Sequence, residues 1–578
     1  MKKLLNVLRP SWLPVSLIIV LTFLQSLSTL YLPRLMADIV DFGVIKSNIH
    51  YIFVMGGIML SITVLGVGFS VASGYLASKV SAEFGRIVRS SVFRHVQSLM
   101  PHEFDQIGTS SLIVRSTNDV MQVQQFMNML LRMMITAPLM ALGGIMMAIS
   151  TNAQLSSALL VILPLLALTA YTILKRGTIL FQWMQDRVDV LNGVIRDTLT
   201  GIRIIRAFGR DQHEEARFEK ANQSLTDVSI KINTLMALLF PMVMLIINLS
   251  TIAILWYGSQ EVGSHTLAIG KLMAFIQYIT QIMFSTMMVS AVFFMIPRAQ
   301  ASARRINEIF HITPQVRDKE NALSTAKNST SHSLLIFDDV SFHYPGARSP
   351  VLTHISFSVL RGKVTAITGG TGSGKTTLLN LMLRFFDVTS GRILLDNINI
   401  RDLAQSAVRS QIAYVPQRAV VFSGTIAENI RFGNPSAGAT EIQNAARIAQ
   451  AASFIRELPG QWDFRVNQDG TNLSGGQKQR LAVARALVKP TEFYLFDDSF
   501  SALDYQTGQG MRAALKDALK EAAIVFVSQR VHTVMDADYI MVLDEGRLAG
   551  AGSHEELMET CEVYQEIVRT QLGKEVSA

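Results

Sequence analysis

Six stretches of this sequence carry no charged residue over lengths that suffice to cross a lipid bilayer, and they restrict the first half of the chain to a membrane domain. A transmembrane helix needs about 20 consecutive apolar residues. The six stretches are residues 12–33, 52–78, 133–150, 154–174, 235–257 and 272–297. The chain of 578 residues is 49% hydrophobic but still 17% charged, which indicates a membrane domain joined to a soluble domain.

The distribution of lysine and arginine predicts which side of the membrane the ends occupy. Segments 79–132 and 175–231 are rich in both residues, whereas the loops on the other side hold only Arg34, Lys46 and Lys271. Basic loops stay on the cytosolic side. The sequence therefore predicts a multi-pass protein of the cytoplasmic (inner or plasma) membrane with both termini in the cytosol. These loops also account for the net charge of +8 without nucleic-acid binding.

The two long cytosolic segments have helical patterning. Apolar residues between Ile195 and Phe208 recur at helical spacing, so we expect transmembrane helices to continue well past the bilayer and then turn back. Short elements at the turns near residues 104–109 and 210–215 would then contact another domain. The pattern alone also allows hairpins without any coupling role.

The predicted spans are rich in methionine and hold no charged residue deep inside them. Flexible thioether side chains suit a cavity for apolar ligands of different shapes, and they suit ordinary helix packing as well. Without buried charge, a proton relay through the membrane is not expected.

The second half contains a phosphate-binding sequence. After a polar linker at 313–333, residues 334–578 alternate apolar strands with helical stretches, as α/β domains do. The sequence GGTGSGKT at 369–376 follows such a strand and opens a helix, the context in which this motif binds phosphate. Backbone N–H groups and Lys375 would hold the phosphates, and the Thr376 hydroxyl would ligate Mg²⁺.

Further polar residues stand at the ends of predicted strands in this domain. Gln417 ends one strand, Asp497 and Asp498 end a second, and Gln529 follows a third. A carboxylate at Asp497 would hold Mg²⁺ opposite the phosphate loop. The other candidates are Tyr344 upstream of the loop, LSGGQ at residues 473–477, and Asp504.

Together these motifs resemble those of ATP-binding cassette (ABC) exporters in which six long helices are fused to a P-loop nucleotide-binding domain with a RecA-like core and a helical subdomain. The resemblance covers essentially the whole chain, and LSGGQ is its most specific element. It implies ATP and Mg²⁺ as cofactors, with Tyr344 stacked on adenine and Gln417 joining Mg²⁺ to the membrane half. The implied ATP-binding residues are Tyr344, Gly369, Gly370, Thr371, Gly372, Ser373, Gly374, Lys375, Thr376, Thr377, Gln417, Ser474, Gly476, Gln477 and Asp504, and the implied metal ligands are Thr376, Gln417 and Asp497.

The resemblance also implies that a single chain cannot work alone. Ser474, Gly476 and Gln477 would bind the γ-phosphate of an ATP molecule held by a second half-transporter. Two nucleotide domains would thus enclose two ATP molecules head to tail. In the membrane half, the residues that look like the family's intracellular loops are Phe104, Gly108, Arg115 and Asp119 for the first and 201–208 for the second.

Two residues depart from the family pattern at the same ATP site. Asp498 stands where active members carry glutamate, and its shorter side chain draws the carboxylate back from the reach that base catalysis needs. Gln529 replaces the switch histidine, and an amide offers no imidazolium charge. His532 is out of place to substitute, and Gln468 stands where relatives usually carry glutamate. We therefore expect a degenerate catalytic site of Lys375, Asp498 and Gln529 that binds ATP but hydrolyses it poorly.

The pattern is closest to the degenerate subunit of bacterial heterodimeric multidrug exporters. The partner would supply the missing glutamate and histidine and carry an altered signature, and the cargo would be hydrophobic or amphipathic compounds moved across a lipid bilayer. The alternatives are a homodimer with a slow aspartate-based site, an exporter of lipid, peptide or siderophore, and a nucleotide-gated regulator that does not transport.

Overall fold

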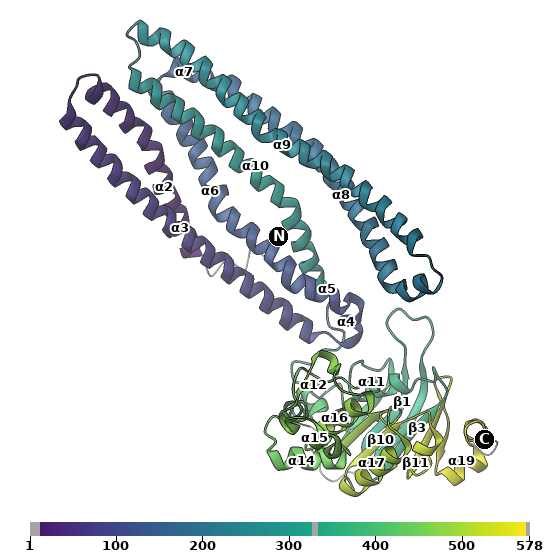
Figure 1. Ribbon diagram of the computed structural model, residues 1–578. Helices are drawn as coiled ribbons and strands as arrows, with labels where there is room; N and C mark the ends of the chain where they lie inside the picture. Colours follow the sequence, from purple (N-terminus) through teal and green to yellow (C-terminus); the bar gives the residue numbers. More distant parts are fainter. Residues whose placement is uncertain (1–11, 326–332, 574–578) are drawn as a thin grey trace. The chain divides into compact units, whose positions relative to one another are not determined.

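The computed structural model describes residues 12–325 and 333–573 (Figure 1). The chain divides into two compact units. The first comprises residues 1–98 and 106–312, and the second comprises residues 99–105 and 313–578. Residues 326–332 of the predicted linker lie outside the described part of the chain.

Long helices make up the described part of the first unit. They are α2 (Trp12–Asp38), η2 (Ile39–Val44), α3 (Ile49–Ser98), α4 (Pro101–Ile107, whose first residues belong to the second unit), α5 (Thr109–Val114), η3 (Arg115–Asp119), α6 (Val120–Thr151), α7 (Ala153–Ser156), α8 (Leu159–Ala207), α9 (Asp211–Gly263) and α10 (Ile269–His311). Within the described residues, six helical segments are long and apolar enough to cross a membrane. The predicted six-helix membrane domain is confirmed.

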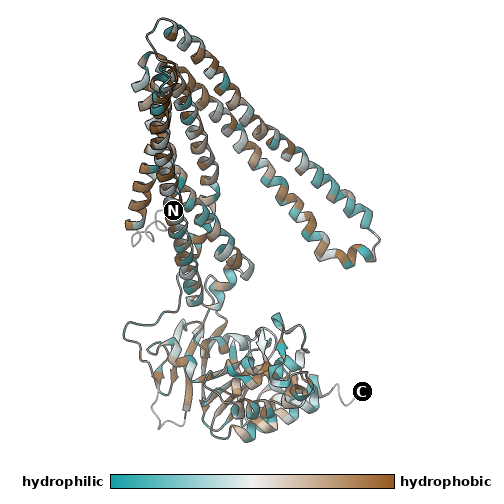
Figure 2. Cartoon of the chain, turned by 60° about the vertical axis from the view of Figure 1, so that its left-hand side comes forward, coloured by the Kyte–Doolittle hydropathy of each residue, from teal (hydrophilic) through white to brown (hydrophobic). Residues whose placement is uncertain are grey.

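The longest of these helices exceed the thickness of a bilayer. The 53 residues of α9 extend about 80 Å, whereas the hydrocarbon core measures about 30 Å. Within the unit α8 packs along α9, and α10 packs along α6 (Figure 1). Figure 2 shows hydrophobic residues along these helices, and outward-facing side chains such as Leu160 and Trp256 are well exposed, as lipid-facing residues are in an isolated chain.

A buried ion pair joins the π-helical turn η3 to α10. Asp119 is fully buried, and its two carboxylate oxygens accept hydrogen bonds from the guanidinium group of Arg305, one of them at 2.7 Å. Arg115 donates in turn to the backbone carbonyl of Arg305 at 2.9 Å. Since a buried carboxylate needs a partner, these contacts hold η3 against α10.

The turn near residues 210–215 differs from the expectation of a short element there. No separate element forms, because α9 starts directly at Asp211, where acidic side chains in the first turn favour a helix N-terminus. Arg132, from a segment that the charge distribution assigns to the cytosol, lies inside the continuous helix α6 and lines a cavity.

The second unit combines strands and shorter helices. The strands are β1 (Ser333–Phe342), β2 (Leu352–Leu360), β3 (Val364–Gly369), β4 (Ser390–Leu395), β5 (Ile398–Asn399), β6 (Ile412–Val415), β7 (Gly424–Thr425), β8 (Arg465–Val466), β9 (Phe493–Asp497), β10 (Ala523–Val527), β11 (Tyr539–Asp544) and β12 (Arg547–Gly552). The helices are α11 (Lys375–Met382), α12 (Gln405–Ser410), α13 (Ile426–Arg431), α14 (Ala439–Ile448), α15 (Ala452–Glu457), η4 (Gln461–Asp463), η5 (Gln468–Gly470), α16 (Gly475–Leu487), α17 (Tyr505–Ala518), α18 (Val531–Val534), α19 (His554–Thr560) and α20 (Glu562–Leu572).

The core of the second unit is a six-stranded sheet in the order β12-β11-β3-β10-β9-β6. The four pairings among β11, β3, β10, β9 and β6 are parallel, and only the edge strand β12 is antiparallel to its neighbour. Strands β9 and β10 are buried at every position, as strands covered on both faces are. A second sheet, β2-β1-β4-β5, is antiparallel. The predicted α/β fold is confirmed.

The described part of the predicted linker, 313–325, packs on the second unit. Val316 is buried, and Leu323 exchanges backbone hydrogen bonds of 2.9 Å with Asp402 and Ala404. Glu103, from the segment at 99–105, accepts the backbone N–H of Gln315 at 2.6 Å. Val316 and Leu323 are single apolar residues in a polar stretch and form no periodic pattern. The sequence therefore does not predict that residues 313–325 pack on the second unit.

Candidate nucleotide site

A cavity of about 340 Å³ lies where the carboxyl ends of β3, β10 and β9 meet. These strands are parallel neighbours, so the loops that follow them converge at one edge of the sheet, where ligands of open α/β sheets bind. The residues that line it are Val351, Thr371, Gly372, Gly374, Lys375, Thr376, Thr377, Gln417, Asp497, Asp498, Val527, Ser528 and Gln529. The phosphate loop and the three strand-end positions of the sequence analysis therefore belong to one site.

The phosphate loop between β3 and α11 depends on glycine at two positions. A Cβ atom on Gly369 would stand 2.1 Å from the carbonyl oxygen of Leu543, which no side chain tolerates. Gly374 has φ +101°, a backbone conformation that favours glycine, and a Cβ there would stand 2.7 Å from the side chain of Leu352. Glycine at these two positions lets the loop turn tightly between β3 and α11.

The ammonium group of Lys375 lies inside the loop. It donates to the carbonyl oxygens of Gly369 and Gly370 at 2.9 and 2.6 Å and to the Ser373 hydroxyl at 3.2 Å. Burial lowers the pKa of Lys375, and the nearby carboxylates of Asp498 and Asp497 partly oppose this shift. A phosphate group would supply the anion that best stabilises this buried cation.

Two consecutive carboxyl groups face the loop from the end of β9. Burial raises the pKa of Asp497 to about 6, although a hydrogen bond with Tyr414 opposes the shift. Burial also raises the pKa of Asp498, against the opposing effects of Arg530 and of hydrogen bonds from Gln417 and Ser528. Each carboxylate is therefore stabilised in its ionised form by a cation or donor brought into the cavity.

The donor set of this cavity fits Mg²⁺. A threonine hydroxyl (Thr376), an amide (Gln417) and a carboxylate (Asp497) line it together, and Mg²⁺ prefers such oxygen ligands. Because the amide N–H₂ of Gln417 donates to Asp498, its amide oxygen remains for a cation. A site built from these oxygen ligands needs neither histidine nor cysteine. Cys561 is buried elsewhere.

Tyr344 lies next to the phosphate loop but packs into the domain core. Its hydroxyl is 3.0 Å from the hydroxyl of Thr377, and its ring packs edge-on against Phe386 and Phe342. The residue is half-buried. Its predicted stacking on adenine stays a prediction.

The signature residues do not line this cavity. Ser474 caps the N-terminus of α16 in a reciprocal pair with Gln477, with hydrogen bonds of 3.3 and 2.9 Å. Gly476 lies beside the loop at 501–504, since a Cβ atom there would stand 3.3 Å from the carbonyl oxygen of Ala502. Asp504 caps α17. Gln468 and His532 also lie outside the lining.

Sequence reasoning missed four residues of this site. Val351, Val527 and Ser528 line the cavity, and Tyr414 donates a hydrogen bond of 3.4 Å to Asp497. Tyr414 and Ser528 stand within or directly after strands that end at the cavity, so their position beside Gln417 and Gln529 was the available signal. Val351 directly precedes β2 of the other sheet, and no local signal identifies it.

Comparison with known proteins identifies the family. Residues 15–287 match the family described as the ABC transporter transmembrane region, and residues 352–501 match the ABC transporter family. An uncharacterized ABC transporter ATP-binding protein of Mycobacterium tuberculosis is 38% identical over 98% of this chain and 97% of its own length. This chain is an ABC exporter half-transporter.

Other relatives of the half-transporter support the same assignment. The uncharacterized ABC transporter ATP-binding protein YfiB of Bacillus subtilis is 37% identical over the full length of both chains. An ATP-dependent lipid A-core flippase of Vibrio vulnificus is 28% identical over 96% of this chain and 95% of its own. A bacterial Atm1-family ABC exporter, solved with ATP bound, superimposes with a TM-score of 0.80 and 26% identity, covering 98% of this chain and 99% of that one.

These similarities cover both units of the half-transporter. They establish an ATP-driven ABC exporter with an ATP-binding domain and a multi-pass membrane domain that uses a lipid bilayer.

Proposed function

We propose that this half-transporter is the degenerate subunit of a heterodimeric exporter of hydrophobic and amphipathic compounds in the cytoplasmic membrane, with both termini in the cytosol. Its own site, built around Lys375, binds ATP and Mg²⁺ but hydrolyses ATP poorly. Its LSGGQ sequence, through Ser474, Gly476 and Gln477, completes the competent site of a partner. The partner supplies the glutamate and histidine that Asp498 and Gln529 replace here.

One observation carries the proposal: the groups that hold nucleotide are intact in the same cavity in which both catalytic positions are altered. Lys375, Thr376 and Asp497 line that cavity together with Asp498 and Gln529. Asp498 is also held by Gln417 and Ser528. A carboxylate that is shorter by one methylene and engaged by two donors is poorly suited to extract a proton from water, because base catalysis depends on hydrogen-bond reach.

The separation of the signature from this cavity supports the need for a second nucleotide domain. Ser474 and Gln477 lie outside the lining, with their hydrogen bonds directed to each other. In a dimer, those backbone and hydroxyl groups become available to a phosphate presented by the partner.

The ATPase activity of the purified full chain tests the proposal. We expect the chain alone to bind Mg²⁺-ATP and to turn it over slowly, with Asp498→Asn having little effect on that rate. In the complex with its partner, ATPase activity should be high and should fall strongly on Ser474→Ala. Robust activity of the chain alone that Asp498→Asn abolishes would refute the proposal and favour the homodimer.

A restored site provides the complementary test. The double variant Asp498→Glu, Gln529→His, co-expressed with the partner, should raise ATP turnover because the second site regains both missing groups. The backbone at Asp498 has φ +40°, a conformation that aspartate tolerates better than glutamate. The single variant Gln529→His is therefore measured beside the double variant. If neither variant has a higher ATP turnover than the unmodified complex, the proposed cause of degeneracy is contradicted.

A nucleotide-gated regulator is separated from an exporter by transport itself. ATP-dependent uptake of an apolar dye into inverted vesicles is expected of the complex, and its loss is expected on Ser474→Ala here. ATP binding and hydrolysis without any uptake would favour the regulator.

A further inference from the structure

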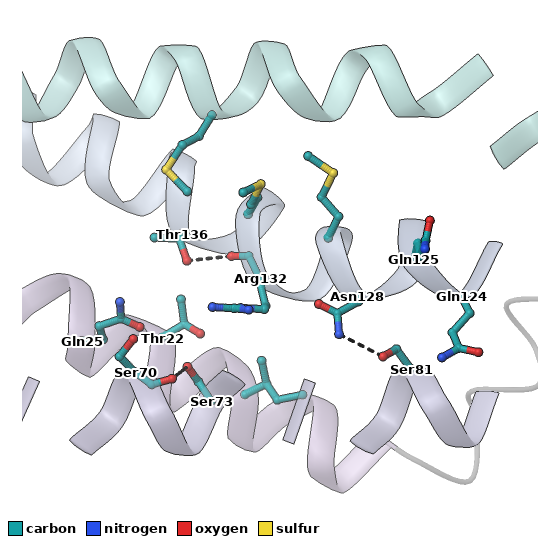
Figure 3. A pocket seen from close by; sticks show the side chains of 14 residues that line it. Thr22, Gln25, Ser70, Ser73, Ser81, Gln124, Gln125, Asn128, Arg132 and Thr136 are labelled. Atoms are coloured by element: carbon teal, nitrogen blue, oxygen red, sulfur yellow. Dashed lines mark hydrogen bonds between the residues drawn. The ribbon is translucent and has the colours of Figure 1, made fainter. Parts of the chain in front are cut away.

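A second cavity, about 490 Å³ in volume, lies within the first unit between α2, α3 and α6, with Met288 of α10 at its border (Figure 3). It is separate from the nucleotide site, and a volume of this size is typical of small-molecule pockets, which measure about 300–1,000 Å³. The helices that form it contain the first, second and third membrane spans.

One cation stands alone in this cavity. Arg132 is the only ionisable side chain in the lining, and it makes no ion pair with any residue that the structure describes. Its guanidinium carbon would lie 3.8 Å from a Cβ on Gly74 of α3, so the group lies directly against the backbone of the facing helix. Arg132 is exposed in the described chain, so its guanidinium group is accessible to a ligand in the cavity. The protein supplies no described counter-ion, so an anionic ligand is the natural partner.

The groups around Arg132 are neutral hydrogen-bonding side chains. Figure 3 shows Arg132 directed toward Thr22, Ser70 and Ser73 on the neighbouring helices. Some hydroxyl and amide donors are already used: Ser73 donates to the carbonyl of Ser70 at 3.1 Å, and Asn128 donates to Ser81 at 3.1 Å.

Three carboxamides complete the polar part of the lining. The side chains of Gln25, Gln124 and Gln125 donate to none of the described residues and accept from none of them. The amide of Gln124 lies against Gly85 of α3, where a Cβ atom would stand 2.2 Å from the amide oxygen. Charged and neutral donors without a carboxylate suit an oxyanion such as phosphate, sulfonate or carboxylate.

Thioether side chains line the other part of the cavity. Met129, Met133 and Met288 border it, and in Figure 3 the sulfur atoms gather on the side away from Thr22 and Ser70. Methionine adapts to irregular apolar groups. The cavity is therefore amphipathic, with an anion-binding part around Arg132 and an adaptable apolar part.

We propose that this cavity binds the anionic headgroup of an amphiphile, with the oxyanion paired to Arg132 and the adjoining apolar portion packed against the methionines. This assignment deepens the proposed function, on which it rests, by naming the class of compound that enters the membrane domain. The same chemistry is offered by an anionic lipid of the bilayer and by a soluble organic anion with an apolar group.

The test measures binding of two fluorescent probes to the full chain in phosphatidylcholine nanodiscs without nucleotide, with empty nanodiscs as the blank. Anilinonaphthalene sulfonate and phenylnaphthylamine share a ring system, and only the first carries a sulfonate. We expect Arg132→Met to weaken sulfonate binding about tenfold, the effect of losing one charge-assisted contact, while the neutral probe binds unchanged. Arg132→Lys should retain most of the sulfonate preference.

Arg86→Met is the matched control, because Arg86 is an exposed arginine paired with Glu83 on α3 and lies outside the cavity lining. It should leave both probes unaffected. Competition by phosphatidylglycerol in the nanodisc would identify a lipid as the source of the anion, whereas competition by decyl sulfate alone would identify a soluble amphiphile.

Equal loss of both probes in Arg132→Met, or an unchanged sulfonate affinity, would overturn the proposal. The wild-type chain gives a decision even if that variant does not fold, because sulfonate binding no tighter than that of the neutral probe would also overturn it. No nucleotide is present, so the result is independent of ATP hydrolysis: failure of the proposed function would appear in the ATPase and uptake measurements, and failure of this inference in the probe affinities.

Discussion

At the scale of single residues, the nucleotide site holds charges at positions where burial opposes them. Asp497 is only 6% exposed and Lys375 only 8% exposed. Burial raises the pKa of the first and lowers the pKa of the second. Such a site is poorly stabilised by itself and is stabilised by Mg²⁺ and phosphate. Nucleotide binding is thereby linked to the stability of the domain.

Replacement of Asp497 tests this linkage. The pKa of Asp497 in the folded chain is about 6, above the ordinary value of 3.8, so the folded state binds the proton more tightly than the unfolded state. Its ionisation therefore lowers the free energy of unfolding as pH rises from about 4 to about 6, by at most about 3 kcal/mol. Asp497→Asn should raise the thermal unfolding temperature of the nucleotide-free chain at pH 7.5, and the gain should vanish near pH 4.

The same variant should lose Mg²⁺-dependent stabilisation by ATP, because a carboxylate ligand is replaced by an amide. Asp517→Asn is the control, since Asp517 is an exposed residue that pairs only with Lys520 at the surface. An unfolding temperature that falls in Asp497→Asn at pH 7.5 would contradict the direction of the pKa shift.

At the scale of elements, the membrane unit is held together by contacts at specific turns as well as by apolar packing. The π-helical turn η3 presents Asp119 to Arg305 of α10, residues far apart in the sequence, and Arg115 adds a hydrogen bond to the same segment. Removing one partner of a buried pair leaves the other uncompensated, which is more costly than the loss of an exposed pair.

Asp119→Ala should therefore lower the free energy of unfolding in detergent by about 1–3 kcal/mol, a range discounted from fully buried pairs because Arg305 is half exposed. The matched control is Glu83→Ala, which removes the exposed pair with Arg86 and should cost below about 1 kcal/mol. The free energy of unfolding is measured for both single variants and for the double variant Asp119→Ala, Arg305→Ala. Equal losses in the two single variants would show that the Asp119 pair has no special weight.

At the scale of the whole molecule, the phosphate loop and the signature sequence belong to one domain but to different surfaces of it. The signature helix α16 begins with a capped N-terminus whose residues lie outside the nucleotide cavity. A complete ATP site then requires a second domain. The expected change on ATP binding is the burial of this helix terminus against a partner.

Thiol labelling of Gly475→Cys measures that burial. A side chain fits at Gly475, since nothing lies within 4 Å of its Cβ position, and the natural thiol, Cys561, is buried. With the partner present, ATP should slow maleimide labelling, because the start of α16 would become buried against the partner. Protection of the chain alone at the same ATP concentration would point to the homodimer, and no protection in either case would contradict a shared site.

Much of the fold follows from local patterns in the sequence. Six uncharged stretches predict six spans because a bilayer demands continuous apolar helices. The glycines from Gly369 to Gly374 predict the phosphate loop because only glycine fits that backbone, and polar residues after strands predict that Gln417, Asp497 and Gln529 meet at one edge of a parallel sheet.

Only the tertiary structure decides which distant side chains meet. The sequence shows Arg132 directly before an apolar stretch, and the packing of α6 against α2 and α3 places it in a cavity beside Gln25. The burial of Asp119 against Arg305 and the approach of Val351 to the phosphate loop are equally non-local. The sequence by itself determined the segments and their chemistry, because those depend on neighbouring residues; the sites between helices and sheets were decided by packing, because no local rule specifies which faces come into contact.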